Sequence, residues 1–465
     1  MKKKVLIILM TIFSFSLFGQ DITGQWQGLL KVQGIQLRLV FNVTKTDNGY
    51  NSTMDSPDQG AKGIPVTNTI FENNKVTFQI TNAKIEYTGE LKEDEIIGTF
   101  KQAGQEFPMN LSQKAIEKEV LNRPQEPTKP YPYYSEDITF QNLKDNISLS
   151  GTLTLPKKEG NFPVVILISG SGPQNRDEEL FGHKPFLVIS DYLTKNEIGV
   201  LRYDDRGVGQ STGDFKNATT ANFATDAESA ITYLKTRKEI NKKKIGLIGH
   251  SEGGIIASIV ASKSKDISFI VLLAGTGIKG DKVLLLQQEL ISKAKGIAQN
   301  DIKKSLETNA KLFEIIDKSN DNQKLKTDLS NLIDETLKSD TNAQIPNGFT
   351  KKEFILMQVN QLSTPWLQYF IKFNPGKVLE KVKCPVLAVS GEKDLQVPPK
   401  ENLTAISDAL KKGGNKKVTT KVFPNLNHLF QESETGLPSE YATIEQTVSP
   451  DLLTEITTWI LNQVN

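Results

Sequence analysis

The sequence predicts an α/β protein with a largely parallel sheet, preceded by a small all-β domain of antiparallel strands. Three observations carry this prediction: alternating apolar and polar residues between 20 and 115, short continuous apolar runs after 134, and helix-length segments between those runs. Charged residues make up 24% of the 465 residues and hydrophobic residues 37%, an ordinary globular mixture that excludes a long coiled coil or a mostly disordered chain.

Residues 1–19 have the layout of a secretory signal peptide. Lys2, Lys3 and Lys4 precede an apolar run at 5–18, and Gly19 is a small residue suited to cleavage. The run is shorter than the roughly 20 apolar residues that span a membrane, although a retained anchor is the alternative. We therefore expect an exported protein, periplasmic or secreted, with no membrane span in the mature chain.

The charge balance and the cysteine content limit which partners and cofactors the sequence predicts. Lys and Arg number 56 against 54 Asp and Glu, and no basic block predicts a nucleic-acid partner. The single cysteine, Cys384, cannot form an internal disulfide and excludes Cys-based zinc sites. We expect no cofactor and no metal. The chain has three histidines, and a histidine base must be His183, His250 or His428.

Residues 20–115 are predicted to form a barrel-like or sandwich domain of six to eight short strands. Residues 35–43 alternate apolar and polar side chains, as a strand with one buried face requires. The opening, 24–28, resembles the first strand of lipocalin-like barrels. Such a domain binds a ligand or partner, or it is a docking appendage without a ligand.

A proline-rich linker, 116–133, is predicted to separate this domain from the α/β domain at 134–465. Residues 138–140 and 147–155 alternate and predict an antiparallel hairpin. Continuous apolar runs then predict parallel strands buried on both faces, at 164–168, 199–201, 245–248, 269–273 and 386–389.

The motif Gly249-His250-Ser251-Glu252-Gly253 is the central functional signal. It directly follows an apolar strand and opens a helix of small and apolar residues. This is the setting of a nucleophile elbow, in which flanking glycines let the neighbouring backbones approach the serine. We expect Ser251 to be a catalytic nucleophile.

A serine nucleophile needs a base and an acid that orients the base, and after an elbow these follow in the order acid, histidine. The apolar strand 385–390 ends just before Glu392 and Asp394, and the next predicted strand, 418–423, leads into the loop that carries His428. The carboxyl ends of parallel strands share one edge of the sheet, where such sites lie. Asp394 lies deeper in its loop and is favoured over Glu392, and His428 is predicted to be the base.

The other histidines have different predicted roles. His250 adjoins Ser251 with its side chain diverging, which indicates packing. His183 is either a pocket residue or a surface histidine. Backbone N–H groups of Glu252 and Ser171 are predicted to hold the developing oxyanion, because Pro173, the other candidate in the loop after residue 168, has no N–H.

These motifs together resemble the α/β-hydrolase superfamily, in particular secreted bacterial carboxylesterases related to the serine aminopeptidase and prolyl-oligopeptidase branches. The resemblance rests on residues 169–177, 202–209, 249–254, 391–394 and 427–428, and it covers 134–465. One departure is Ser169, where relatives often carry His before the glycine. The resemblance implies hydrolysis of small acyl esters, and the β domain also resembles the appendage of some of these esterases.

About 110 residues separate the apolar runs that end at 273 and begin near 385, far more than an ordinary connection. Helical spacing within them predicts a helical cap at 279–376 over the site. Trp366 either lines the pocket or anchors the cap. The leading function is hydrolysis of a small-molecule ester through an acyl-enzyme, and the alternatives are a peptidase for short peptides and a non-catalytic binding protein.

Overall fold

The computed structural model describes residues 21–32, 35–59, 61–102, 104–117, 122–339, 345 and 349–464. The predicted signal peptide lies outside these residues. The chain divides into two compact units. Among the described residues, the first unit runs from 21 to 117 apart from Ile35, and the second runs from 122 to 464.

The first unit is a curled antiparallel sheet with the strand order β4-β3-β2-β1-β10-β8-β7-β6-β5, and β9 pairs with β8. The sheet curls far enough for Ser52 of β3 and Thr69 of β5 to share a hydrogen bond of 2.6 Å between their hydroxyls. Large side chains such as Trp26, Phe41 and Tyr87 fill the interior. The elements are β1 (Gly24–Val32), β2 (Ile35–Thr46), β3 (Gly49–Ser56), η1 (Pro57–Gln59), β4 (Ala61–Pro65), β5 (Asn68–Glu72), β6 (Lys75–Ile80), η2 (Thr81–Ala83), β7 (Ile85–Lys92), β8 (Glu95–Gln102), β9 (Gln105–Pro108) and β10 (Leu111–Ser112).

The described residues of this unit thus contain ten strands, more than the six to eight predicted from the sequence. The alternating runs in the sequence did not identify β3, β4, β5 or β8. The residues of β4 and β5 are all exposed or half-buried. A strand without a buried face gives little apolar alternation, so the pattern on which the prediction rested is absent there.

The second unit contains a sheet in the order β11-β12-β14-β13-β15-β16-β17-β18. Strands β11 and β12 form the predicted antiparallel hairpin, β12 is antiparallel to β14, and the pairings from β14 through β18 are parallel. All five continuous apolar runs form strands, as predicted. The strands are β11 (Tyr134–Asn142), β12 (Ile147–Leu155), β13 (Phe162–Ile168), β14 (Gly199–Tyr203), β15 (Ile240–His250), β16 (Phe269–Leu273), β17 (Val386–Gly391) and β18 (Val418–Phe423).

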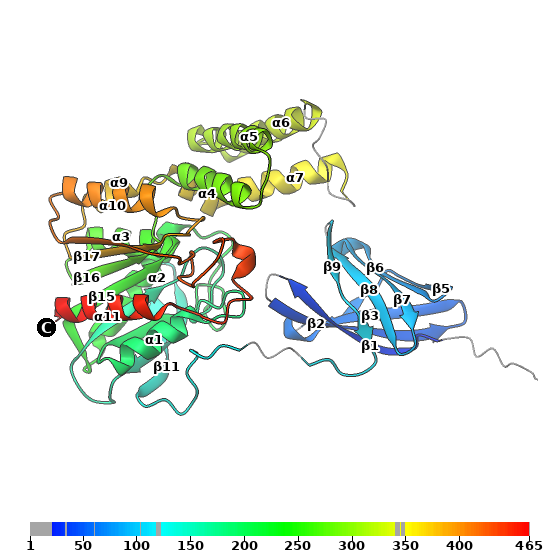
Figure 1. The fold of residues 1–465 in the computed structure, drawn as a ribbon, viewed down its shortest axis with the longest axis horizontal. Helices are drawn as coiled ribbons and strands as arrows, with labels where there is room; N and C mark the ends of the chain where they lie inside the picture. The colour runs from blue at the N-terminus through cyan, green and yellow to red at the C-terminus, as the bar shows by residue number, and fades with distance from the viewer. Residues whose placement is uncertain are drawn as a thin grey trace, which may run out of the picture. The chain divides into compact units, whose positions relative to one another are not determined.

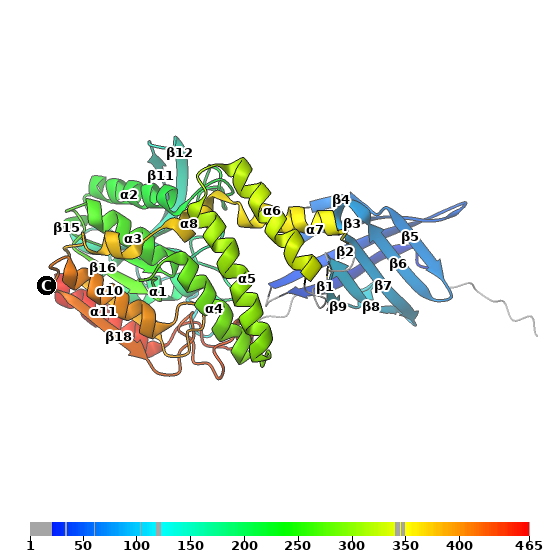
Figure 2. The ribbon, with the colours of Figure 1, turned by 90° about the horizontal axis from the view of Figure 1, so that it is seen from above.

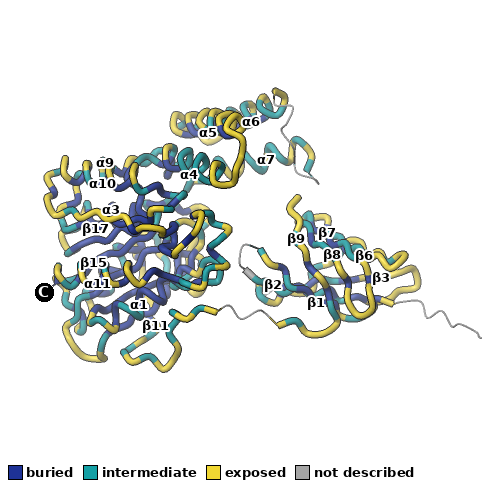
Figure 3. The backbone as a smooth tube through the Cα atoms, viewed as in Figure 1, coloured by how far each residue is buried: buried dark blue, intermediate teal, exposed yellow. Residues whose placement is uncertain are grey.

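Helices cover both faces of this sheet, and each face has its own apolar core (Figures 1 and 3). Along β13, Val164, Ile166 and Ile168 face one core, while Val165 and Leu167 face the other. Helices α2, α3, α9 and α10 pack on the first face, and α1 and α11 on the second. Their bounds are α1 (Pro185–Lys195), α2 (Thr220–Thr236), α3 (Glu252–Lys263), α9 (Pro375–Leu379), α10 (Pro399–Lys412) and α11 (Pro450–Val464), with η3 (Pro438–Glu440) before α11.

Between β16 and β17 the chain forms a further group of helices with a separate apolar core (Figure 2). Leu312, Phe313, Ile316, Leu329 and Ile371 belong to this core. The helices are α4 (Gly280–Ala294), α5 (Gln299–Lys318), α6 (Asn322–Ser339), α7 (Lys351–Leu362) and α8 (Pro365–Lys372). They fall within the segment 279–376 that was predicted to be helical. Within the described part of the chain, no helix is long and apolar enough to cross a membrane.

The described part of the predicted linker from residue 122 onward belongs to the second unit. The Arg123 guanidinium donates hydrogen bonds to the carbonyls of Ile444 and Ala442, both at 2.8 Å. The Gln125 side chain donates to the carbonyl of Val448 at 2.6 Å. This part of the segment is therefore held by side chains rather than acting as a free spacer.

Candidate active site

Ser251 lies at the turn between β15 and α3, the strand–turn–helix setting predicted from the motif. Its backbone has φ 53° and ψ −115°, and its N–H donates to the Leu273 carbonyl at 2.8 Å. A positive φ is costly for a residue with a side chain and persists only where the surroundings enforce it. The turn thus projects the Ser251 side chain from the carboxyl end of β15.

The glycines of the motif permit very close backbone contacts. A Cβ added to Gly253 would lie 2.1 Å from the carbonyl oxygen of Ile168 and 2.8 Å from that of Ser169. A Cβ on Gly249 would lie 2.1 Å from the Gly253 carbonyl oxygen. The first turn of α3 therefore packs directly on the end of β13, which brings the loop after β13 next to Ser251.

Replacing Gly253 with Ala is expected to lower the free energy of unfolding by about 3 kcal/mol or more, because the obstructing atoms are backbone carbonyls that cannot rotate away. Urea unfolding measures this change. Gly376→Ala is the matched control, since the nearest atom to its added Cβ is the Asn374 side chain at 3.3 Å. Equal stability of the two variants would contradict the close contact at Gly253.

Asp394 and His428, predicted from separate strand ends, lie in hydrogen-bond contact. His428 Nδ1 lies 2.9 Å from Asp394 Oδ2, and both residues are at most 5% exposed. Asp394 Oδ1 accepts the backbone N–H groups of Gln396 at 2.9 Å and Val397 at 2.8 Å. These bonds fix the carboxylate, and with it the orientation of the imidazole. The rival acid, Glu392, is exposed and accepts the Asn425 N–H instead.

His428 is linked to the elbow through His250, the neighbour of Ser251. The two imidazole centroids are 4.8 Å apart, and His250 Nε2 lies 3.1 Å from the His428 carbonyl oxygen. No hydrogen bond joins the Ser251 hydroxyl to His428 among the described residues. Catalytic hydrogen bonds of unliganded enzymes often tighten only when substrate binds, so this geometry is compatible with a nucleophile–base pair.

The loop after β13 lies beside Ser251 and carries Ser171. A Cβ on Gly170 would be 3.3 Å from the Ser251 Cβ. The Gly170 N–H donates to Glu178 Oε1 at 2.6 Å, so it is occupied. Within the part of the chain that the structure describes, the N–H groups of Ser171 and Glu252 have no hydrogen-bond acceptor. Both are therefore available to an incoming oxygen.

Asp205, which the sequence analysis did not assign, holds this loop. Its Oδ1 accepts the Ser169 hydroxyl at 2.9 Å and its Oδ2 accepts the Gln174 N–H at 3.0 Å. Burial raises the pKa of Asp205 to about 8, against the effect of these two donors. The Ser169 hydroxyl thus ties the loop to Asp205. The sequence signal that could have identified Asp205 is its position just past the buried strand β14.

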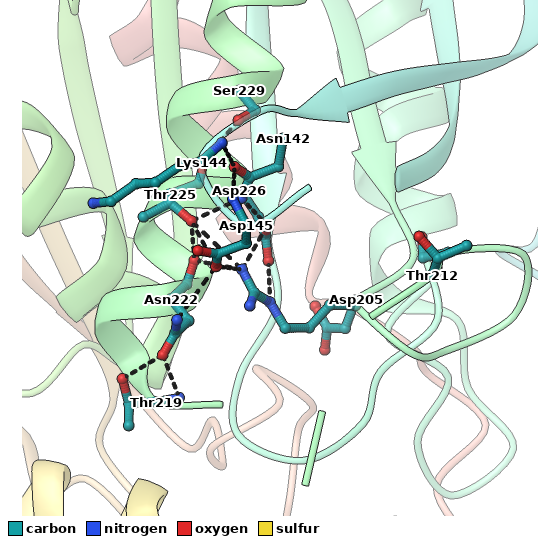
Figure 4. Close-up of polar contacts among 12 residues, drawn as sticks. Asn142, Lys144, Asp145, Asp205, Thr212, Thr219, Asn222, Thr225, Asp226 and Ser229 are labelled. Atoms are coloured by element: carbon teal, nitrogen blue, oxygen red, sulfur yellow. Dashed lines mark hydrogen bonds and ion pairs between the residues drawn. The ribbon is translucent and has the colours of Figure 1, made fainter. Parts of the chain in front are cut away.

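A polar cluster that includes Asn142, Asp145 and Asp226 (Figure 4) holds the guanidinium of Arg206, the residue after Asp205. The Arg206 guanidinium donates to both carboxylate oxygens of Asp226, at 2.8 and 2.9 Å, and pairs with Asp145 at 2.8 Å. Asn142 donates to Asp226 at 2.7 Å. Charge-assisted, bidentate pairs of this kind are strong and directional, so the loop after β14 is firmly anchored behind Asp205.

Trp366, predicted as a pocket or anchor residue, contacts the residue that follows Ser251. Its indole N–H lies 2.8 and 2.9 Å from the two carboxylate oxygens of Glu252, which also accept the Thr220 hydroxyl at 2.6 Å. The Trp366 ring stacks on Phe370 of the same helix, with 5.3 Å between centroids. Helix α8 is thus tied to the elbow through the hydrogen bonds between Trp366 and Glu252.

Replacing Trp366 with Phe is expected to destabilise the protein in a pH-dependent way. Burial raises the pKa of Glu252, and the Thr220 and Trp366 donors partly offset this rise. A carboxyl with a raised folded pKa contributes stability below its unfolded pKa and loses it as pH rises through the folded pKa. Removing the indole N–H raises the pKa further, so the free energy of unfolding should fall by about 1.5–3 kcal/mol at pH 8 and by less at pH 4.

Urea unfolding at both pH values measures the effect, with Trp459→Phe as the matched control. The Trp459 ring packs edge-on against Phe269, and its N–H has no partner among the described residues. Its replacement should change stability equally at pH 4 and pH 8. The same pH dependence in both variants would rule out the Glu252 explanation.

His183, predicted as a pocket or surface residue, is in neither place. It is 1% exposed, and Nδ1 contacts the Thr447 hydroxyl at 2.9 Å while Nε2 contacts the Tyr441 carbonyl at 2.8 Å. The Gln431 amide nitrogen lies 3.0 Å from Nε2. Burial lowers the pKa of His183 to about 4. Both ring nitrogens are occupied, so the residue has no free polar atom for a substrate.

Comparison with known proteins places similar sequences among hydrolases. Residues 227–432 match the family model for the C-terminal part of BAAT and acyl-CoA thioester hydrolases, and residues 140–289 match an acyl transferase model. The chain is 26% identical over 336 residues to esterase EstD of Thermotoga maritima, covering 71% of this chain and 68% of the relative. An uncharacterized 31.7 kDa protein of Escherichia coli is 23% identical over 59% of this chain and 87% of its own length.

Solved structures that the chain matches include esterase Pf2001 from Pyrococcus furiosus, with TM-score 0.43, 16% identity and coverage of 71% of this chain and 93% of that chain. Est1E from Butyrivibrio proteoclasticus, solved with ferulic acid, has TM-score 0.40, 17% identity and coverage of 70% and 99%. The two family models are named for an acyl-CoA thioester hydrolase and an acyl transferase, and the relative from Thermotoga maritima is named an esterase.

Proposed function

We propose that this protein is a serine hydrolase that cleaves carboxylic esters of small acyl groups through an acyl-enzyme. The observation that carries the proposal is the buried Asp394–His428 hydrogen bond, formed between two strand ends beside a serine held at positive φ. An orienting carboxylate and an imidazole next to an elbow serine are the parts that serine acyl transfer requires.

In the proposed reaction, the Ser251 oxygen attacks the ester carbonyl while His428 Nε2 takes its proton. Asp394 holds the imidazole by Nδ1 and stabilises the imidazolium that forms. The oxyanion accepts hydrogen bonds from the N–H groups of Ser171 and Glu252. His428 then gives the proton to the departing alcohol. A water, activated by His428, attacks the acyl-enzyme and releases the acid and free Ser251.

We further propose that helices α4–α8 act as a cap that limits acyl length and restricts water around the acyl-enzyme. The bond between Trp366 of α8 and Glu252 supports this role, because it ties the helical group to the residue beside the nucleophile. The two groups of Glu252 thus have different proposed roles. Its N–H donates to the oxyanion, and its carboxylate accepts the Trp366 N–H of the cap.

Thioester hydrolysis is a second candidate, favoured by the match of residues 227–432 to the thioester hydrolase model. The chemistry differs only in the leaving group. Comparing kcat/KM for an acetyl oxygen ester, an acetyl thioester and an acetyl anilide tests the assignment. We expect the oxygen ester to be preferred. Preference for the thioester would favour the second candidate, preference for the anilide a peptidase, and no turnover of any of them a binding protein.

A further inference from the structure

His250 is a buried histidine whose two ring nitrogens both face hydrogen-bond acceptors. It is 5% exposed, Nδ1 lies 2.9 Å from Glu178 Oε1, and Nε2 lies 3.1 Å from the His428 carbonyl oxygen. A backbone carbonyl can only accept. The sequence analysis expected His250 to be a packing residue, and the structure instead gives it two polar partners.

The Glu178 oxygen also behaves as an acceptor. The same Oε1 that faces His250 accepts the Gly170 N–H at 2.6 Å, and Glu178 is 1% exposed. An ionised carboxylate is an acceptor only and can accept both donors at this one oxygen, and the Gly170 contact of 2.6 Å is as short as a charge-assisted hydrogen bond. Each nitrogen of His250 therefore faces an oxygen that is placed to accept a hydrogen bond from it.

A neutral imidazole has one N–H and cannot donate at both nitrogens. Burial disfavours the charged ring, but Glu178, the His428 carbonyl and the nearby Asp394 outweigh it and raise the pKa of His250. The His428 ring, 4.8 Å away, is the other titratable neighbour. The remaining side chains around the adjoining cavity of about 10 Å³, from α1, β16, α11 and the loop after β18, are apolar. A cavity of this size holds at most about one water, so solvent offers His250 little alternative bonding.

We propose that His250 is a buried imidazolium which, with the carboxylate of Glu178, locks together the three loops of the active site. Glu178 accepts the Gly170 N–H and so holds the loop after β13, which carries the proposed oxyanion donor Ser171. His250 belongs to the elbow, and its second N–H donates to the backbone carbonyl of His428. The proposal rests on the proposed serine-hydrolase function. His250 and Glu178 are positioning residues, since neither touches the reacting atoms.

The protonation state can be measured without turnover. In protein carrying ring-¹⁵N histidine and a purification tag without histidine, the NMR spectrum contains only three histidine rings. At pH 7.5 we expect one ring, assigned through His250→Gln, to carry protons on both nitrogens, while His183 is neutral. A neutral His250 would overturn the proposal. Because Ser251→Ala should give the same spectrum, failure of the hydrolase assignment is distinguishable from failure of this one.

Glu178→Gln tests the positioning role. Its side-chain oxygen can still accept from both Gly170 and His250 Nδ1, but the neutral amide no longer supplies the negative charge that stabilises a buried imidazolium, so His250 should become neutral. We expect one ring proton to be lost and kcat to fall by up to about 100-fold with little change in KM, since a shift of about 1 Å in a catalytic group can cost that much. Glu179→Gln is the matched control, an exposed neighbour that should leave both measurements unchanged. Unchanged kcat in Glu178→Gln would overturn the positioning role, and if that variant does not fold, the wild-type spectrum still decides the charge assignment.

Discussion

Ser251→Ala is expected to lower kcat for a short-chain ester by about 10⁵- to 10⁶-fold, because no other group in the proposed site can form the acyl-enzyme. Alanine keeps the Cβ, so the fold at this positive-φ position should be retained. Steady-state assays with a p-nitrophenyl ester, alongside urea unfolding, separate loss of chemistry from loss of structure.

Ser262→Ala is the control for this variant. Ser262 lies on the same helix, α3, and its hydroxyl donates to the Ile259 carbonyl at 2.7 Å. Its replacement should leave kcat within about twofold of the wild type, a change of under 0.5 kcal/mol. Turnover by Ser251→Ala at the wild-type rate would remove Ser251 as nucleophile.

Asp394→Asn is expected to lower kcat by about 10⁴-fold at neutral pH. The Asn oxygen can still accept from the Gln396 and Val397 N–H groups, so the loop should keep its conformation. The Asn amide, however, would donate to His428 Nδ1. The imidazole would then carry its proton on Nε2 and could not take the proton of Ser251.

Glu392→Gln tests the rival acid. Glu392 accepts the Asn425 N–H at 3.0 Å on the surface, and the replacement retains an acceptor. Activity close to that of the wild type is expected. A larger loss in Glu392→Gln than in Asp394→Asn would transfer the acid role to Glu392.

The sequence predicted what depends on local pattern. The continuous apolar runs predicted the buried parallel strands. The loops after the predicted strands 385–390 and 418–423 supplied the candidates Asp394 and His428, because parallel strands present their carboxyl ends at one edge. The glycines around Ser251 gave the elbow. Each of these signals is contained within a few consecutive residues of the chain.

What the sequence could not predict depends on pairs that are distant in sequence. Glu178 and His250 are 72 residues apart, and Glu252 and Trp366 are 114 apart. A buried polar side chain cannot be recognised from the residues next to it in the sequence, because only the fold determines which residue it contacts. His183 shows the same limit: its neighbours in sequence are unremarkable, and its buried position depends on contacts with Tyr441 and Thr447.

Labelling with a fluorophosphonate tests the central claim most directly, because the reagent reacts with a serine only when a base activates it and donors hold the oxyanion. After proteolysis and mass spectrometry, the account predicts one adduct per chain, on the peptide containing Ser251, and none in Ser251→Ala. It also predicts that Asp394→Asn reacts much more slowly than the wild type. An unlabelled wild-type protein, or an adduct on a different residue, would contradict it.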